Sequence, residues 1–132
     1  MSGKIDKDID IKQKNIIFRK LPKRGEVVLG INASDVAVLP NPVNKFTEYC
    51  FPYKLMEYMA CNVPIVATNI GDVSLVLKKY EGSLCKPSNS EDLAQKIILK
   101  FKDNKIPNYK KDLKELEWKV LSKKLDRIIS NI

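Results

Sequence analysis

The amino-acid sequence predicts an α/β fold in which a parallel sheet lies between two layers of helices. Short apolar segments of strand length alternate with longer segments whose apolar residues recur at helical spacing. This alternation indicates βαβ units, and right-handed crossovers then place helices on both faces of the sheet. The 132 residues are enough for one such domain, and no internal repeat interrupts the pattern.

The first part of the chain contains two expected strands. Residues 1–14 are polar and charged and are predicted to be a lead-in, whereas residues 15–18 (NIIF) are predicted to be a short buried strand. A short helix is expected over residues 26–33. The second strand is expected at residues 36–39 (VAVL), an uninterrupted apolar run that Pro40 ends. The side chains expected to face inward from the helix are Val27, Val28 and Ile31.

The central part is expected to form a loop, a helix, a turn and a strand. Residues 41–51 are predicted to be a loop, and loops of this length are usually functional or disordered. Pro52 suits the first position of the helix, and Asn62 suits the left-handed residue that follows it. Residues 65–68 (IVAT) are too short and too β-branched to be anything but a buried strand. The expected buried side of the helix consists of Leu55, Met56, Met59 and Ala60.

Residues 69–72 are expected to form a turn into a helix over residues 73–80, followed by a last short strand at residues 82–85. Ser90 is expected to cap the next helix, with two acidic residues in its first turn. The apolar face of that helix is expected to contain Leu93, Ala94, Ile97, Ile98 and Phe101.

The last residues are predicted to form one amphipathic helix over residues 110–129, after a break at Pro107. The chain is therefore divided into a domain at residues 15–109 and a C-terminal helical segment at residues 110–132, after the lead-in. Trp118 in this helix is expected to be a core residue or an interface anchor.

Composition restricts the classes of function. The chain has no histidine, which excludes histidine acid–base chemistry and histidine-ligated zinc within it, and three cysteines lack metal-ligand spacing. The net charge of +8 comes from scattered lysines rather than from a basic stripe with interleaved aromatics, so no nucleic-acid partner is predicted. No apolar run is long enough to span a bilayer. The expected location is cytoplasmic, with peripheral contact at the inner membrane face as the minority interpretation.

Two charged residues in the predicted central helix indicate a ligand. Lys54 lies in the first turn, where the helix dipole disfavours a cation unless an anion binds there. Glu57 lies on the same face three residues later, where its carboxylate can accept hydrogen bonds from two neighbouring hydroxyls. A phosphate beside a ribose indicates a nucleotide at the carboxyl ends of the strands. The structural alternative is a surface ion pair between Lys54 and Glu57.

Three segments carry a resemblance to a known family. The segment FPYKLMEYMACNVPIVAT resembles the donor-binding segment of the group 1 glycosyltransferases, which are retaining enzymes of the GT-B fold that use nucleotide sugars. The preceding ASDVAVLPNP and the following NIGDVSLVL resemble its neighbouring strand and phosphate-side loop. The resemblance implies that the chain is part of the Rossmann-like C-terminal domain of a GT-B enzyme, and that it transfers a sugar from a donor such as a UDP- or GDP-sugar to an acceptor.

The resemblance also implies roles for individual residues. Lys54 would face the diphosphate, and Glu57 would bind the ribose. The glutamate that contacts the donor sugar in the family is expected at Tyr49, and the nearest candidate is Glu48, one residue earlier. The residues implied to act in catalysis are Glu48 and Lys54. The residues implied to bind the donor nucleotide are Phe51, Lys54, Leu55, Glu57, Thr68 and Gly71.

Gly71 matches a glycine whose backbone approaches the phosphates, with a plain turn glycine as the alternative, and Asp72 replaces a second glycine that is common in the family. No metal and no cofactor beyond the nucleotide sugar are implied.

The resemblance covers only part of a GT-B enzyme. The first strands of the donor domain and the whole acceptor domain have no counterpart, so sheet edges would be left open. We therefore expect a missing acceptor domain or a partner chain, self-association of the isolated chain, and little activity without the acceptor domain. The alternative function is a non-catalytic α/β interaction module with the same fold.

Overall fold

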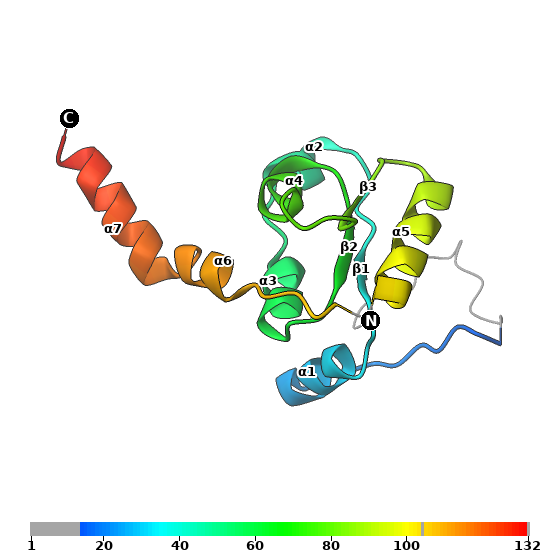
Figure 1. Cartoon of the computed structure of the whole chain (residues 1–132). Helices are drawn as coiled ribbons and strands as arrows, with labels where there is room; N and C mark the ends of the chain where they lie inside the picture. Colours follow the sequence, from blue (N-terminus) through cyan, green and yellow to red (C-terminus); the bar gives the residue numbers. More distant parts are fainter. Residues whose placement is uncertain (1–13, 104, 132) are drawn as a thin grey trace.

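The computed structural model describes residues 14–103 and 105–131, and it confirms the predicted α/β class (Figure 1). Three parallel strands form one sheet in the order β1 (Ala37–Leu39), β2 (Ile65–Thr68) and β3 (Leu84–Cys85). In this register Ala37 lies opposite Ile65, and Ala67 lies opposite Leu84. Every residue of β2 is buried because β2 is the central strand, which explains its continuous apolar sequence.

The predicted strand at residues 15–18 is wrong, because these residues have no regular structure. Ile17 is 84% exposed, although the sequence predicts it to be buried. Among the described strands, β1 and β3 each have β2 as their sole neighbour, so residues 15–18 pair with none of them. Their apolar composition alone does not provide the backbone hydrogen bonds that a strand requires.

Helix α1 (Arg24–Asn32) starts two residues before the predicted helix, because Glu26 accepts a hydrogen bond from the Lys23 backbone N–H at 3.2 Å and so holds the first turn. Ile31 is buried as predicted, whereas Val28 is exposed, which contradicts its predicted inward position. Helix α1 therefore buries only part of its apolar surface.

The region predicted to be an eleven-residue loop contains a short helix, α2 (Lys45–Tyr49). Asn44 caps this helix by accepting a hydrogen bond from the Thr47 N–H at 2.9 Å, and the Thr47 hydroxyl lies 3.2 Å from the Asn44 N–H as its acceptor. This reciprocal cap stabilises a helix that is too short to show apolar periodicity. The loop prediction is therefore wrong for residues 45–49.

Helix α3 (Tyr53–Ala60) and the strand after it agree closely with the prediction. Pro52 occupies the N-cap rather than the first helical position, and Asn62 adopts the predicted left-handed conformation with φ of 57°. Leu55 and Met59 are buried, whereas Ala60 is exposed and was wrongly assigned to the buried side. Burying an apolar side chain of this size contributes about 1.5–3 kcal/mol.

The remaining helices are α4 (Gly71–Leu77), α5 (Ser90–Asp103), α6 (Lys110–Glu115) and α7 (Trp118–Ile129). Helix α3 contacts β1 and helix α4 contacts β2 on one side of the sheet, while α5 covers β2 and β3 on the other (Figure 1). Asn89 caps α5 by accepting from the Asp92 N–H at 2.8 Å, in place of the predicted Ser90. The apolar face of α5 is only partly covered, since Ile98 and Phe101 are exposed.

The predicted single C-terminal helix is two helices, because Glu117 adopts an extended backbone conformation with ψ of 137°. Helix α6 is fixed to the domain by Asp112, whose carboxylate accepts hydrogen bonds from the Lys79 ammonium and the Tyr80 hydroxyl. Burial alone would raise the pKa of Asp112, but these two hydrogen bonds outweigh it and hold the pKa below its usual value.

Tyr109 is buried against Tyr80, with 4.7 Å between ring centroids, and its burial raises its pKa to about 12. The domain boundary predicted between residues 109 and 110 therefore cuts through a packed cluster.

Candidate functional site

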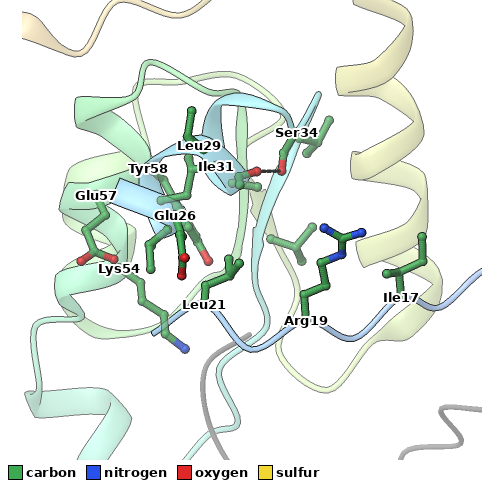
Figure 2. Close-up of a pocket in the computed structure, with 15 residues that line it drawn as sticks. Ile17, Arg19, Leu21, Glu26, Leu29, Ile31, Ser34, Lys54, Glu57 and Tyr58 are labelled. Carbon is green, nitrogen blue, oxygen red and sulfur yellow. Dashed lines mark hydrogen bonds between the residues drawn. The ribbon is translucent and has the colours of Figure 1, made fainter. Parts of the chain in front are cut away.

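A hollow of about 740 Å³ opens beside β1 (Figure 2). Its walls come from the irregular residues 17–21, helix α1, strand β1 and helix α3. The floor is mostly apolar because it consists of α1 and of the side of β1 that no described strand covers. A concave, largely apolar surface with a few polar groups at its rim is the usual form of a small-molecule site.

Lys54 and Glu57 both line this hollow from helix α3 (Figure 2). Both side chains are exposed, and both lie on the same face of the helix, one turn apart. The ion pairs among the described residues are Lys79–Asp112 and Lys105–Asp103, so the predicted alternative of a Lys54–Glu57 ion pair is not observed. Lys54 and Glu57 are therefore available to a ligand.

The start of helix α3 leaves room for an anion. Pro52 provides no side-chain hydrogen bond to the helix, and the first turn contains Lys54 but no acidic residue. The first turns of α1, α2, α4, α5 and α6 each contain at least one acidic residue. Backbone N–H groups and a lysine thus meet at the start of α3 without a negative charge from the helix itself.

Two charged residues of the hollow were not predicted from the sequence. Arg19 lies in the irregular segment, and Glu26 lies in the first turn of α1 (Figure 2). Glu26 shows the sequence signal of a helix start, which identifies its capping role but not its place in the hollow. Tyr58 is also part of the wall; burial and the nearby negative charge of Glu57 both raise its pKa, so it is a neutral hydroxyl near pH 7.

Glu48 and Gly71 form a second group through the packing of α2 against α4. Gly71 has φ of +50°, and a Cβ atom built on it would lie 2.4 Å from the Glu48 carbonyl oxygen. The glycine is therefore required by this backbone contact, which accounts for it without a phosphate. The Glu48 side chain is exposed, so its carboxylate is accessible while its backbone is held in place.

The other predicted binding residues are more deeply buried. The Leu55 side chain belongs to the core, and its N–H donates to the Pro52 carbonyl at 2.9 Å. Thr68 is buried at the carboxyl end of β2, and Phe51 is half-buried against the core. Of the predicted site residues, only Lys54 and Glu57 line the hollow, and the remaining five lie outside its walls.

Two further structural results bear on the expectations from composition. Within residues 14–103 and 105–131, no cluster of three or more histidine, cysteine, aspartate or glutamate side chains has the geometry to hold a metal ion. The helices described are also too short or too polar to cross a membrane.

Comparison with known proteins identifies similar sequences over most of the chain. Residues 6–129 match the family described as Glycosyl transferases group 1. One similar protein is the N,N'-diacetylbacillosaminyl-diphospho-undecaprenol alpha-1,3-N-acetylgalactosaminyltransferase of Campylobacter jejuni, which is 27% identical over 122 residues, covering 85% of this chain. An uncharacterized glycosyltransferase of Methanocaldococcus jannaschii is 32% identical over 109 residues, covering 70% of this chain. The matched region spans 31% of the length of each relative. No solved structure gives a significant match.

Proposed function

The chain belongs to the group 1 glycosyltransferases, and we propose that it provides the donor half of the active site of a retaining enzyme that transfers a sugar from a nucleoside diphosphate. The observation that carries this proposal is that Lys54 and Glu57 lie unpaired on one face of α3, at the rim of the hollow beside β1. A cation and a carboxylate one turn apart match the two polar ends of a nucleoside diphosphate, which are its phosphates and its ribose hydroxyls.

Lys54 and the start of α3 bind the diphosphate in this proposal. The first turn offers backbone N–H groups and one ammonium to the anion, and no acidic side chain of this turn opposes it. When the bond between the sugar and the diphosphate breaks, negative charge develops on the departing phosphate oxygen. Lys54 stabilises that charge because its ammonium carries the opposite charge beside the departing oxygen.

Glu57 holds the ribose, since a carboxylate can accept one hydrogen bond at each oxygen from two adjacent hydroxyls. The apolar floor of the hollow provides a surface for the base, with Tyr58 in its wall. The proposal assigns Glu48 to the transferred sugar, because its carboxylate is exposed and its backbone is fixed against Gly71. UDP- and GDP-sugars are the donors to test first.

Transfer also requires an acceptor, and we assign it to a part of the enzyme beyond this chain. The chain spans about a third of the relatives, and β1 exposes one edge of the sheet next to the hollow among the described residues. A second domain above this region would bring the acceptor to the sugar and exclude water. The isolated chain should therefore bind a donor without transferring its sugar efficiently.

Donor binding tests the proposal directly. Titration of the chain with UDP- and GDP-sugars in a calorimeter should show binding that Glu57→Gln weakens by roughly 10- to 100-fold, because hydrogen bonds to a charged group contribute about 1.5–3 kcal/mol. Lys54→Met should weaken binding similarly, and it should affect UDP more than uridine. The matched control is Glu81→Gln, an exposed glutamate outside the hollow. Equal affinities for the Glu57 and Glu81 variants would contradict the proposal.

One observation favours the alternative of a non-catalytic interaction module. The structure separates Lys54 and Glu57 from Glu48 and Gly71, since only the first pair lines the hollow. A module that has lost its chemistry would bind none of the nucleotide sugars at millimolar concentration, and neither Glu57→Gln nor Lys54→Met would change its behaviour.

A further inference from the structure

The hollow beside β1 contains two charged side chains that the proposed phosphate and ribose contacts leave unassigned. Arg19 and Glu26 both line it, and neither belongs to helix α3. Arg19 comes from the irregular residues 17–21, and Glu26 comes from the first turn of α1. A few polar groups in a largely apolar hollow usually fix the orientation of a ligand, so both side chains are candidates for a ligand contact.

Glu26 keeps hydrogen-bond acceptors available in the hollow. Its side chain is half-buried, and its Oε2 atom accepts the Lys23 N–H at 3.2 Å. This contact orients the carboxylate without using all of it, because an ionised carboxylate accepts about four hydrogen bonds. Within residues 14–103 and 105–131, no ion pair includes Glu26. Glu26 can therefore accept hydrogen bonds from two neighbouring N–H groups of a ligand.

Arg19 supplies the opposite kind of group. Its side chain is exposed, and a guanidinium offers only hydrogen-bond donors. Arg19 also takes no part in the ion pairs found in the described part of the chain. In the view of Figure 2, Glu26 lies between Glu57 and Arg19, and the three residues come from three different segments. A ligand that starts at Glu57 can thus meet a carboxylate and then a guanidinium along the hollow.

Guanine is the nucleotide base whose polar edge fits these two groups. Its N1–H and its N2 amino group are adjacent donors, and its O6 and N7 atoms are adjacent acceptors. A carboxylate accepts from the donors, and an arginine donates to O6 and N7 in the pairing that is common in nucleic-acid recognition. Uracil has one N–H between two carbonyl groups, so a carboxylate that accepts from this N–H also faces an acceptor. Adenine has one amino group beside an acceptor, which produces the same conflict.

We propose that the base bound in the hollow is guanine, with Glu26 accepting from N1–H and the N2 amino group and Arg19 donating to O6 and N7. Guanine recognition rests on the proposed function, because the base extends from a ribose held by Glu57. The sugar donor is then a GDP-sugar rather than a UDP-sugar, and Glu26 and Arg19 are the residues that determine this specificity.

A comparison of GDP with inosine diphosphate isolates the Glu26 contact, because these nucleotides differ only in the N2 amino group. In calorimetric titrations of the unmodified chain, GDP should bind roughly 10- to 100-fold more tightly than inosine diphosphate, which is the range for one hydrogen bond to a charged group. UDP and ADP should also bind more weakly than GDP. This comparison needs no substitution, so it does not depend on the folding of a variant.

Two variants separate the two contacts. Glu26→Gln keeps an oxygen for the Lys23 N–H but loses the carboxylate, so GDP and inosine diphosphate should bind with nearly equal affinity. Arg19→Met should weaken both nucleotides by the same factor and preserve their ratio, because both have O6 and N7. A purely structural role of Glu26 would weaken all nucleotides alike. The matched controls are Glu91→Gln in the first turn of α5 and Arg24→Met in α1, since neither side chain lines the hollow.

The possible results distinguish guanine recognition from donor binding as such. Equal affinities for GDP, inosine diphosphate and UDP, all weakened by Glu57→Gln, would overturn guanine recognition and leave the proposed function intact. A preference for GDP over inosine diphosphate that persists in Glu26→Gln would overturn the role of Glu26. The absence of binding by any nucleotide would overturn guanine recognition and the proposed function together.

Discussion

The substitution Gly71→Ala tests how α2 is held at the carboxyl ends of the strands. The added Cβ would lie 2.4 Å from the Glu48 carbonyl oxygen and 3.2 Å from the Thr47 carbonyl oxygen, on a residue with φ of +50°. A left-handed conformation costs a non-glycine residue about 1–2 kcal/mol, and relieving the overlap costs about 1–3 kcal/mol more. The expected loss of about 2–5 kcal/mol is a large fraction of the stability of a domain.

Thermal unfolding followed by circular dichroism at 222 nm measures this effect. Gly71→Ala should lower Tm by roughly 10 °C, since about 1 kcal/mol corresponds to several degrees in a domain of this size. The matched control is Gly25→Ala in helix α1, where an added Cβ would meet no atom within 4 Å. This substitution should stabilise the chain by less than about 1 kcal/mol. A Tm for Gly71→Ala equal to that of the unmodified chain would refute the packing role of this glycine.

Two further substitutions test other contacts. Asp112→Asn should destabilise the chain at pH 7 by about 1–3 kcal/mol, towards the lower value because Lys79 is half-exposed. The folded state lowers the pKa of Asp112, so its contribution is present above the unfolded pKa of about 4 and is lost as pH falls through the folded value. The stability difference between the chain and its variant, measured by urea unfolding, should therefore shrink as the pH is lowered from 7 into acid, and a constant difference would contradict this cause. Asn44→Ala should lower the free energy of unfolding by about 0.5–2 kcal/mol, because it removes the acceptor of the Thr47 N–H. Amide hydrogen exchange in α2 should become faster. Unchanged exchange would show that packing on α4 alone holds the helix.

The sequence contains enough information to predict the central part of the fold. Residues 65–68 combine β-branching, short length and a proline before them, and these local signals agree with the burial of β2 between two strands. Asn62 was predictable because a left-handed residue after a helix favours glycine or asparagine. These elements are determined by local chemistry and by the core of this chain, so sequence reasoning was sufficient for them.

The errors occur where a segment depends on partners or on short-range hydrogen bonds. Residues 15–18 have the composition of a strand but pair with none of the described strands. Helix α2 depends on the Asn44–Thr47 cap, and a five-residue helix has no periodicity to detect. The split between α6 and α7 cannot be detected from the sequence, because the apolar spacing continues across the break although the backbone of Glu117 is extended.

The candidate site was predicted residue by residue with uneven results. Lys54 and Glu57 were identified because their charges are unexpected at those helix positions, and the structure places them together at the hollow. Arg19 carries no such signal, since its position depends on how an irregular segment crosses the domain. Leu55 is implied by the resemblance alone, and its side chain is completely buried, so its binding role stays a prediction.

The contact between Gly71 and Glu48 links the fold to the chemistry proposed for the site. Lys54 and Glu57 are held by α3, which packs on the core, whereas Glu48 is held by α2, which packs on α4. A disturbance of α2 should therefore affect the sugar contact without affecting the nucleotide contacts. A variant at Gly71 that remains folded at low temperature should bind UDP or GDP as the unmodified chain does, but should lose any preference for the nucleotide sugar over the nucleotide. Equal loss of both affinities would mean that the two groups form one rigid site, and that the hollow beside β1 alone does not bind the nucleotide.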